Sequence, residues 1–206
     1  MQSPLKKFKG FFIYITFTHM SDTIINIPNQ DTKWIHSVIA RIETGSLNPK
    51  EEAYLKRILR VYHMPDLSRQ RWNPVEMIIS RVLQSDYYKD FIQVNVPEVV
   101  AEYETFDMFH FPVNHVARRP SDSYFIQKDS VDTSISMLLR PHTTVMWYHY
   151  IVKWGWWEEL KEKWEIKILS SWKVYRVDEL DTTHHECFHQ IDGLKIVRKD
   201  IENITQ

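Results

Sequence analysis

The stretch VYRVDELDTTHHECFHQIDG, residues 174–193, concentrates charged, polar and aromatic side chains that could form one binding site. Its apolar ends and polar middle predict two strands joined by a loop. Because side chains alternate along a strand, Arg176 and Asp178 share one face of the first strand. Phe188, Gln190 and Asp192 share a face of the second by the same rule. Paired as a hairpin, the strands present a guanidinium, carboxylates, an amide and an aromatic ring on one surface.

These groups suit a zwitterionic substrate that binds beside a purine nucleotide. Arginine clamps phosphate or carboxylate, aspartate and glutamine accept an ammonium group, and phenylalanine stacks on a base. The whole chain has 206 residues and only 4 glycines, which leaves no room for a glycine-rich phosphate loop. A bound nucleotide must therefore be held in another way.

Outward from this stretch, the sequence mixes strand and helix patterns. Strands are expected at FIQVNVPEV (91–99), SYFIQ (123–127), EIKILS (165–170), WKVYRVD (172–178) and FHQIDGLKIV (188–197). In the first of them Ile92, Val94 and Val96 alternate with Gln93 and Asn95, and Pro97 ends the strand. Helical or looped stretches separate these strands, so the expected fold class is α+β with a mostly antiparallel sheet.

Three helices are expected before the first of these strands. Apolar residues at helical spacing over 34–45 follow a cap at Asp31 or Thr32. A second helix begins at Asn48-Pro49 and runs towards residue 65, so that the pair forms a helical hairpin for packing or docking. A third begins at Asn73-Pro74, and its apolar stripe is expected to pack on a sheet.

The segment WYHYIVKWGWWEELKEKW (147–164) is rich in tryptophan. A helix that packs its aromatic face on the sheet is the favoured interpretation. An aromatic ladder that stacks on single-stranded bases is the alternative, although the interleaved arginines of such a ladder are absent from the segment.

The 174–193 stretch resembles motif 2 of the class II aminoacyl-tRNA synthetases in its phenylalanyl alpha-subunit form. That pattern is an arginine, an acidic residue two positions on, Asp-x-Thr-His, and Phe-His-Gln-x-Glu/Asp-Gly. The sequence supplies Arg176, Asp178, Asp181, Thr183, His184, Phe188, His189, Gln190, Asp192 and Gly193. HVARRPSDSYFI (115–126), LLRPHTTV (138–145) and VVAEYETFDMFHFPVNH (99–115) resemble upstream pieces of the family in the same order. The resemblance covers roughly residues 73 to 197.

The resemblance implies a class II synthetase-like antiparallel sheet flanked by helices, with the motif 1 and motif 2 regions and a preceding helical hairpin. It also implies a phenylalanine–tRNA ligase reaction, in which ATP activates phenylalanine to an adenylate that then acylates tRNA(Phe). Arg176 would be the catalytic residue, bridging the amino-acid carboxylate and the α-phosphate. ATP would also contact Asp178, His184 and Phe188, the last by stacking on adenine. The residues expected around the amino-acid ammonium group are His142, Thr144, Gln190 and Asp192.

The sequence also departs from the family pattern. His-Pro-Ala-Arg appears as His115-Val116-Ala117-Arg118, and Pro141 precedes His142. After Gln206 no phenylalanine-rich specificity segment or arginine-bearing motif 3 follows, so the catalytic domain is expected to be partial and weakly active alone. The expected cofactors are ATP and Mg²⁺, with metal ligands supplied elsewhere. The expected partners are phenylalanine, tRNA(Phe), a beta subunit and a C-terminal complement. A non-catalytic synthetase-like binding or assembly protein is the alternative.

The net charge, the single cysteine and the histidines give further expectations. The net charge is −1, so any contact with nucleic acid must be local or shared with a partner. The single cysteine, Cys187, fits a reducing, cytoplasmic compartment and is interpreted as a packing residue. His184 and His185 point in opposite directions in an extended chain, so no metal site is expected there. His189 faces away from Gln190 and is interpreted as structural.

The N-terminus leaves alternatives open. Lysines precede the apolar run GFFIYITF (10–17), which is too short to span a bilayer as a helix, and no membrane association is expected. The run is a targeting segment, an N-terminal strand, or part of an upstream extension before Met20. The expected organisation is therefore this segment over 1–19, a helical segment over 20–70, and a partial class II catalytic domain over 71–206.

Overall fold

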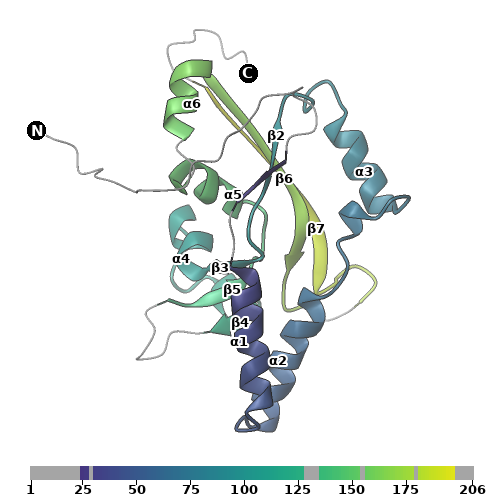
Figure 1. Ribbon diagram of the computed structural model, residues 1–206, viewed down its shortest axis with the longest axis vertical. Helices are drawn as coiled ribbons and strands as arrows, with labels where there is room; N and C mark the ends of the chain where they lie inside the picture. Colours follow the sequence, from purple (N-terminus) through teal and green to yellow (C-terminus); the bar gives the residue numbers. More distant parts are fainter. Residues whose placement is uncertain (1–23, 28–29, 128–134, 154–155, 179–180, 198–206) are drawn as a thin grey trace, which may run out of the picture.

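The computed structural model describes residues 24–27, 30–127, 135–153, 156–178 and 181–197, apart from the side chains of 153–159 (Figure 1). The apolar run at 10–17 and its alternative interpretations lie outside the described residues. No helix among the described residues is long and apolar enough to cross a bilayer.

The larger sheet has four strands in the order β1-β2-β6-β7. They are β1 (Ile24–Asn26), β2 (Ile92–Asn95), β6 (Glu165–Tyr175) and β7 (Cys187–Val197). β1 and β2 pair in parallel, as do β2 and β6, whereas β6 and β7 form a long antiparallel hairpin. The hairpin runs diagonally through the centre of Figure 1.

The smaller sheet has three strands in the order β3-β5-β4, all antiparallel. They are β3 (Val99–Ala101), β4 (Phe125–Gln127) and β5 (Met137–Leu139). The expected α+β class is confirmed, with the correction that the larger sheet is mixed. Parallel pairing arises because helices, rather than tight turns, separate β1 from β2 and β2 from β6.

The first expected strand ends before Pro97, as predicted, and is β2. The residues after the proline form β3, a strand of the other sheet that was not predicted separately. Proline offers no N–H to a ladder, so a strand is easily interrupted there. The strands expected at 165–170 and 172–178 are instead the single strand β6, which ends at Tyr175.

The N-terminal helices α1 (Asp31–Glu43) and α2 (Pro49–Tyr62) form the expected hairpin, which projects below the sheets in Figure 1. Asn48 caps α2 by accepting hydrogen bonds from the N–H groups of Lys50 and Glu51, as predicted. The cap predicted for α1 is wrong. The Asp31 carboxylate accepts instead from the N–H groups of residues 98 and 99, and so ties α1 to β3.

Helix α3 (Pro74–Leu83) starts at Asn73 as predicted, after the short 3-10 helix η1 (Leu67–Arg69). Its expected burial on a sheet is largely wrong. Only Ile79 is buried, and Ile78 is 62% exposed. Figure 1 shows α3 beside the large sheet, at the outer right of the molecule.

The remaining helices are short, and most of them cover one face of the large sheet. They are α4 (Glu102–Thr105), η2 (Asp107–Phe109), η3 (Val116–Arg118), α5 (Val145–Tyr148), the π-helical turn η4 (His149–Lys153) and α6 (Trp156–Lys163). The described parts of the tryptophan-rich segment are thus mostly helical, in three short helices where a single helix was predicted. Trp147 packs against the core, whereas Trp164 is 47% exposed.

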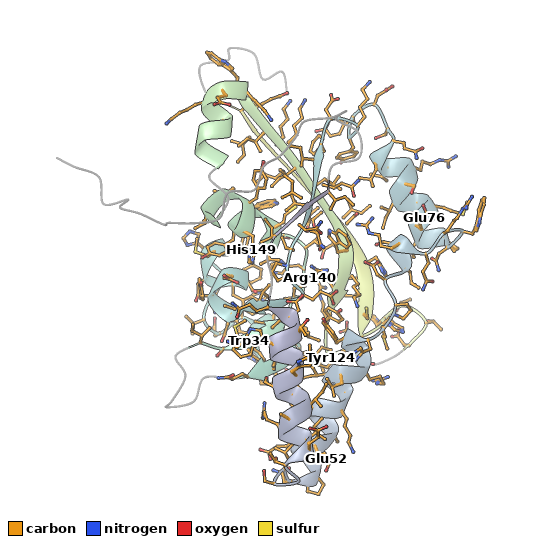
Figure 2. The ribbon with its side chains drawn as sticks, in the orientation of Figure 1. Trp34, Glu52, Glu76, Tyr124, Arg140 and His149 are labelled. Atoms are coloured by element: carbon orange, nitrogen blue, oxygen red, sulfur yellow. The ribbon has the colours of Figure 1, made fainter. Side chains whose placement is uncertain are left out.

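Two buried clusters lie on opposite faces of the β6–β7 hairpin. One joins Ile166 and Ile168 to β2 and α5, and the other joins Tyr175 and Cys187 to α1 and α2. Between the sheets lies Arg140, 1% exposed, whose guanidinium donates to the carbonyls of Val96, Pro97 and Lys173 (Figure 2). A buried arginine needs such partners, and here they connect the two sheets.

Candidate active site on the β6–β7 hairpin

The strand register places the predicted site residues of β7 on one face. Phe188 lies opposite Val174, Gln190 opposite Trp172 and Asp192 opposite Ser170. This face also carries Ile168 and Leu194, which pack against the cluster that includes α5. The segment that leads into α5 therefore covers the polar part of the face.

Arg176 lies just beyond the end of β6, one residue past the pair Tyr175–Cys187. Its N–H donates to the carbonyl of Glu186 at 3.1 Å, which continues the ladder by one step. Its Nε donates to the carbonyl of Pro141 at 3.2 Å, and its Cζ lies 5.0 Å from the ring centroid of Phe188. The side chain is exposed, so a ligand can reach its terminal nitrogens.

The Asp192 carboxylate holds the segment after β5 against the hairpin. The hydroxyls of Thr143 and Thr144 donate to its Oδ2 at 2.6 and 2.9 Å. Gln190 Oε1 accepts from the N–H of Thr143 at 3.4 Å. The predicted residues Thr144, Gln190 and Asp192 are therefore brought together. Thr143 was missed, although its place between His142 and Thr144 could have signalled it.

His142 lies in an aromatic cage on this face. Its ring is parallel to that of Phe111, with centroids 6.2 Å apart, and Phe109 meets it edge-on at 5.9 Å. Both ring nitrogens are buried without a partner in normal hydrogen-bond geometry. Burial lowers the pKa of His142 to about 4, although the Asp192 carboxylate and the main chain at Thr105 oppose this shift. The ring is therefore neutral at pH 7.

His184 lies in the exposed loop between β6 and β7. The carboxylate of Asp181 accepts from the N–H of Thr183 at 2.6 Å, from the N–H of His184 at 2.7 Å and from His184 Nδ1 at 2.9 Å. The hydrogen bond and charge of Asp181 raise the pKa of His184. No contact in the described part of the chain joins His184 to Arg176 or Phe188, so the structure does not bring it to the hairpin face.

Asp178 is close to Arg176 through the main chain, because its N–H donates to the Arg176 carbonyl at 3.1 Å. His189 faces the opposite side of the hairpin, where its Nε2 lies 3.0 Å from Asp66 Oδ1, in agreement with a structural role. Cys187 is buried, and burial raises the pKa of its thiol to about 11, which fits a packing residue.

No group of three or more His, Cys, Asp or Glu side chains within the described ranges is arranged to hold a metal ion.

Comparison with known proteins identifies the family. Residues 61–203 match the family described as "tRNA synthetases class II core domain (F)". The match spans well over half of the chain and includes the whole β6–β7 hairpin. The chain belongs to this family.

Curated relatives are alpha subunits of phenylalanine–tRNA ligase. The protein from Trichlorobacter lovleyi is 30% identical over 164 residues, which are 77% of this chain and 44% of that protein. The protein from Clostridium novyi is 29% identical over 172 residues, 82% of this chain and 46% of that protein. The chain thus spans less than half the length of these relatives.

A solved structure of pyrrolysyl-tRNA synthetase from Desulfitobacterium hafniense matches 76% of this chain and 45% of its own, at 18% identity and a TM-score of 0.40. Assignment to the class II core family follows from the sequence match.

Proposed function

We propose that the chain forms part of the catalytic core of a phenylalanine–tRNA ligase, which activates phenylalanine with ATP and transfers it to tRNA(Phe). The observation that carries the proposal is the exposed guanidinium of Arg176, fixed at Nε by Pro141 and set 5.0 Å from the Phe188 ring. An arginine beside an aromatic ring fits a phosphate next to an adenine base. The cofactors of the proposed reaction are ATP and Mg²⁺, and the Mg²⁺ ligands lie outside the described residues.

In the first step, a carboxylate oxygen of phenylalanine attacks the α-phosphorus of ATP, and the bond to the leaving pyrophosphate breaks. Negative charge builds on the phosphoryl oxygens as the new bond forms. Arg176 stabilises that charge and aligns the two substrates, and Phe188 stacks on the adenine. No protein nucleophile takes part. In this proposal Asp178 and His184 contact the nucleotide.

The ammonium group of phenylalanine binds on the same face. The carboxylate of Asp192 attracts it, and Gln190, Thr144 and His142 surround it. Since His142 is neutral at pH 7, it adds no repulsion, and the one ring nitrogen that carries no hydrogen can accept from an ammonium group. The catalytic part of the chain is residues 71–206, and the helical hairpin α1–α2 within residues 20–70 supports it.

The partners of this activity are a beta subunit and a C-terminal complement that supplies the rest of the active site. The test is phenylalanine-dependent ATP–pyrophosphate exchange by the chain assembled with both. Arg176→Ala should lower the exchange rate by at least about 100-fold, because it removes a group aimed at the developing charge. The matched control, Arg71→Ala, removes an exposed arginine that lies against Trp72 on the α3 side.

An assembled, folded complex that shows no exchange with wild-type chain would refute the enzymatic proposal. It would favour a non-catalytic binding or assembly protein instead.

A further inference from the structure

Glu186 is a buried carboxylate in the loop that returns to β7, and its side chain is 1% exposed. Two arginines of α2 reach it. Arg60 Nη2 donates to its Oε2 at 2.6 Å, and Arg57 Nε donates to its Oε1. The hydroxyl of Tyr124 also donates to Oε1, at 2.7 Å. Figure 2 shows Tyr124 beside α2, where this group of four side chains connects the helix, β4 and the hairpin.

The same group holds both arms of the hairpin loop. On the incoming arm, Arg57 Nη2 donates to the carbonyl of Asp178 at 3.4 Å. On the outgoing arm, the carbonyl of Glu186 accepts from the N–H of Arg176 at 3.1 Å. Between them, the N–H of Val177 donates to the carbonyl of Asp122 at 3.0 Å. The main chain at Arg176 and Val177 is thus held by Glu186 and Asp122, and α2 in turn holds Glu186 and the carbonyl of Asp178.

The charges make this group sensitive to the loss of any member. Burial alone would raise the pKa of Glu186, but the hydrogen bonds from Tyr124 and Arg57 outweigh it and hold that pKa below its ordinary value. Removing the charge of Glu186 takes the anionic partner away from Arg57 and Arg60, so the charge-assisted hydrogen bonds that hold the loop against α2 weaken. The main chain that carries Arg176 is then held less firmly.

The arginines of this group precede the part of the chain that matches the family, which starts at residue 61. We propose that Arg57, Arg60 and Glu186 form a clamp by which α2 positions Arg176 for ATP. Glu186 is then a positioning residue that acts through Arg176 without touching substrate. This inference rests on the proposed function for its substrate, whereas its structural part can be tested without any substrate.

Hydrogen exchange tests the structural part. Peptides that cover residues 174–188 are compared by mass spectrometry in wild-type chain and in Glu186→Gln, which keeps the shape of the side chain and removes its charge. The N–H groups of Arg176 and Val177 should exchange at least about tenfold faster in the variant. The control Lys56→Gln removes a neighbouring cation of α2 that pairs with exposed Glu52 and should leave these rates unchanged.

A second control separates positioning from loss of stability. Ile166→Val trims a buried residue of the other cluster, on the opposite face of the hairpin from Tyr175 and Cys187. It should lower the unfolding midpoint and leave exchange at residues 174–188 unchanged under native conditions. Equal exchange in Glu186→Gln and wild type would overturn the clamp.

The functional part is read in the assembled enzyme. Glu186→Gln should lower kcat for pyrophosphate exchange about tenfold, because Arg176 acts on the charge that develops in the transition state, and Glu186→Asp should partly restore it. An unchanged kcat, or no rescue by Glu186→Asp, would overturn positioning of Arg176. If wild type shows no exchange activity at all, the proposed function fails, and the hydrogen-exchange comparison still decides the clamp.

Discussion

Replacing His142 by phenylalanine should remove a specific loss of stability at acid pH. The pKa of His142 falls from 6.5 to about 4 in the folded chain because the ring is buried. Between these values the unfolded chain binds a proton that the folded chain does not, so unfolding becomes easier as pH falls. A shift of one pKa unit corresponds to 1.36 kcal/mol, and the shift therefore costs roughly 3 kcal/mol at pH 4 relative to pH 7.

The assay is the free energy of unfolding by urea at several pH values, for wild type and His142→Phe. Groups that do not interact with His142 titrate alike in both proteins and cancel in the comparison. The stability of wild type relative to the variant should therefore fall as pH falls from about 6.5 to about 4. The cage of Phe109 and Phe111 can accept a third aromatic ring, so the variant is expected to fold.

A nuclear magnetic resonance titration of the histidine rings gives the same test directly. His142 should remain neutral down to about pH 4, whereas the pKa of His184 should lie above its ordinary value because of Asp181. If His142 gains its proton near pH 6.5, or if the pH dependence of stability is the same in wild type and His142→Phe, the conclusion that His142 is buried and neutral is wrong.

Other variants test other parts of the fold and site. The hydrogen bonds of Asp66 lower its pKa from 3.8 to about 2. Asp66→Asn should therefore lower the free energy of unfolding by roughly 2 kcal/mol above about pH 4, and this difference between the two proteins should vanish as pH falls through about 2. Urea unfolding at several pH values measures it. Arg140→Met should still unfold cooperatively in urea, with a free energy of unfolding lower by about 3 kcal/mol, because several buried carbonyls lose their hydrogen-bond donor. Asp192→Asn should raise the KM for phenylalanine at least about tenfold in pyrophosphate exchange, with little change for ATP.

The sequence predicted the hairpin well because its signals are local. Alternation placed Phe188, Gln190 and Asp192 on one face, and the register agrees. The Asn48 cap was also readable, since an asparagine before a proline satisfies the first N–H groups of a helix wherever that helix packs.

Long-range contacts could not be read in the same way. Asp31 has the composition of a helix cap, but its carboxylate binds the main chain of β3, 68 residues away along the chain at Val99. The stripe of α3 predicted burial, yet Ile78 is exposed, because periodicity shows which side of a helix is apolar and not what covers it. The contacts of Glu186 with Arg57 and Arg60 likewise depend on how α2 docks against the hairpin.

The most direct test of the central claim is the binding of a non-reactive phenylalanyl-adenylate analogue, measured by calorimetry on the chain assembled with its beta subunit and C-terminal complement. Wild type and Arg71→Ala should bind it equally, and Arg176→Ala should bind it at least about 100-fold more weakly, since a charged hydrogen-bonding partner of the phosphate is lost. Equal binding by wild type and Arg176→Ala, or no binding by wild type, would contradict the assignment of the β6–β7 face as the active site.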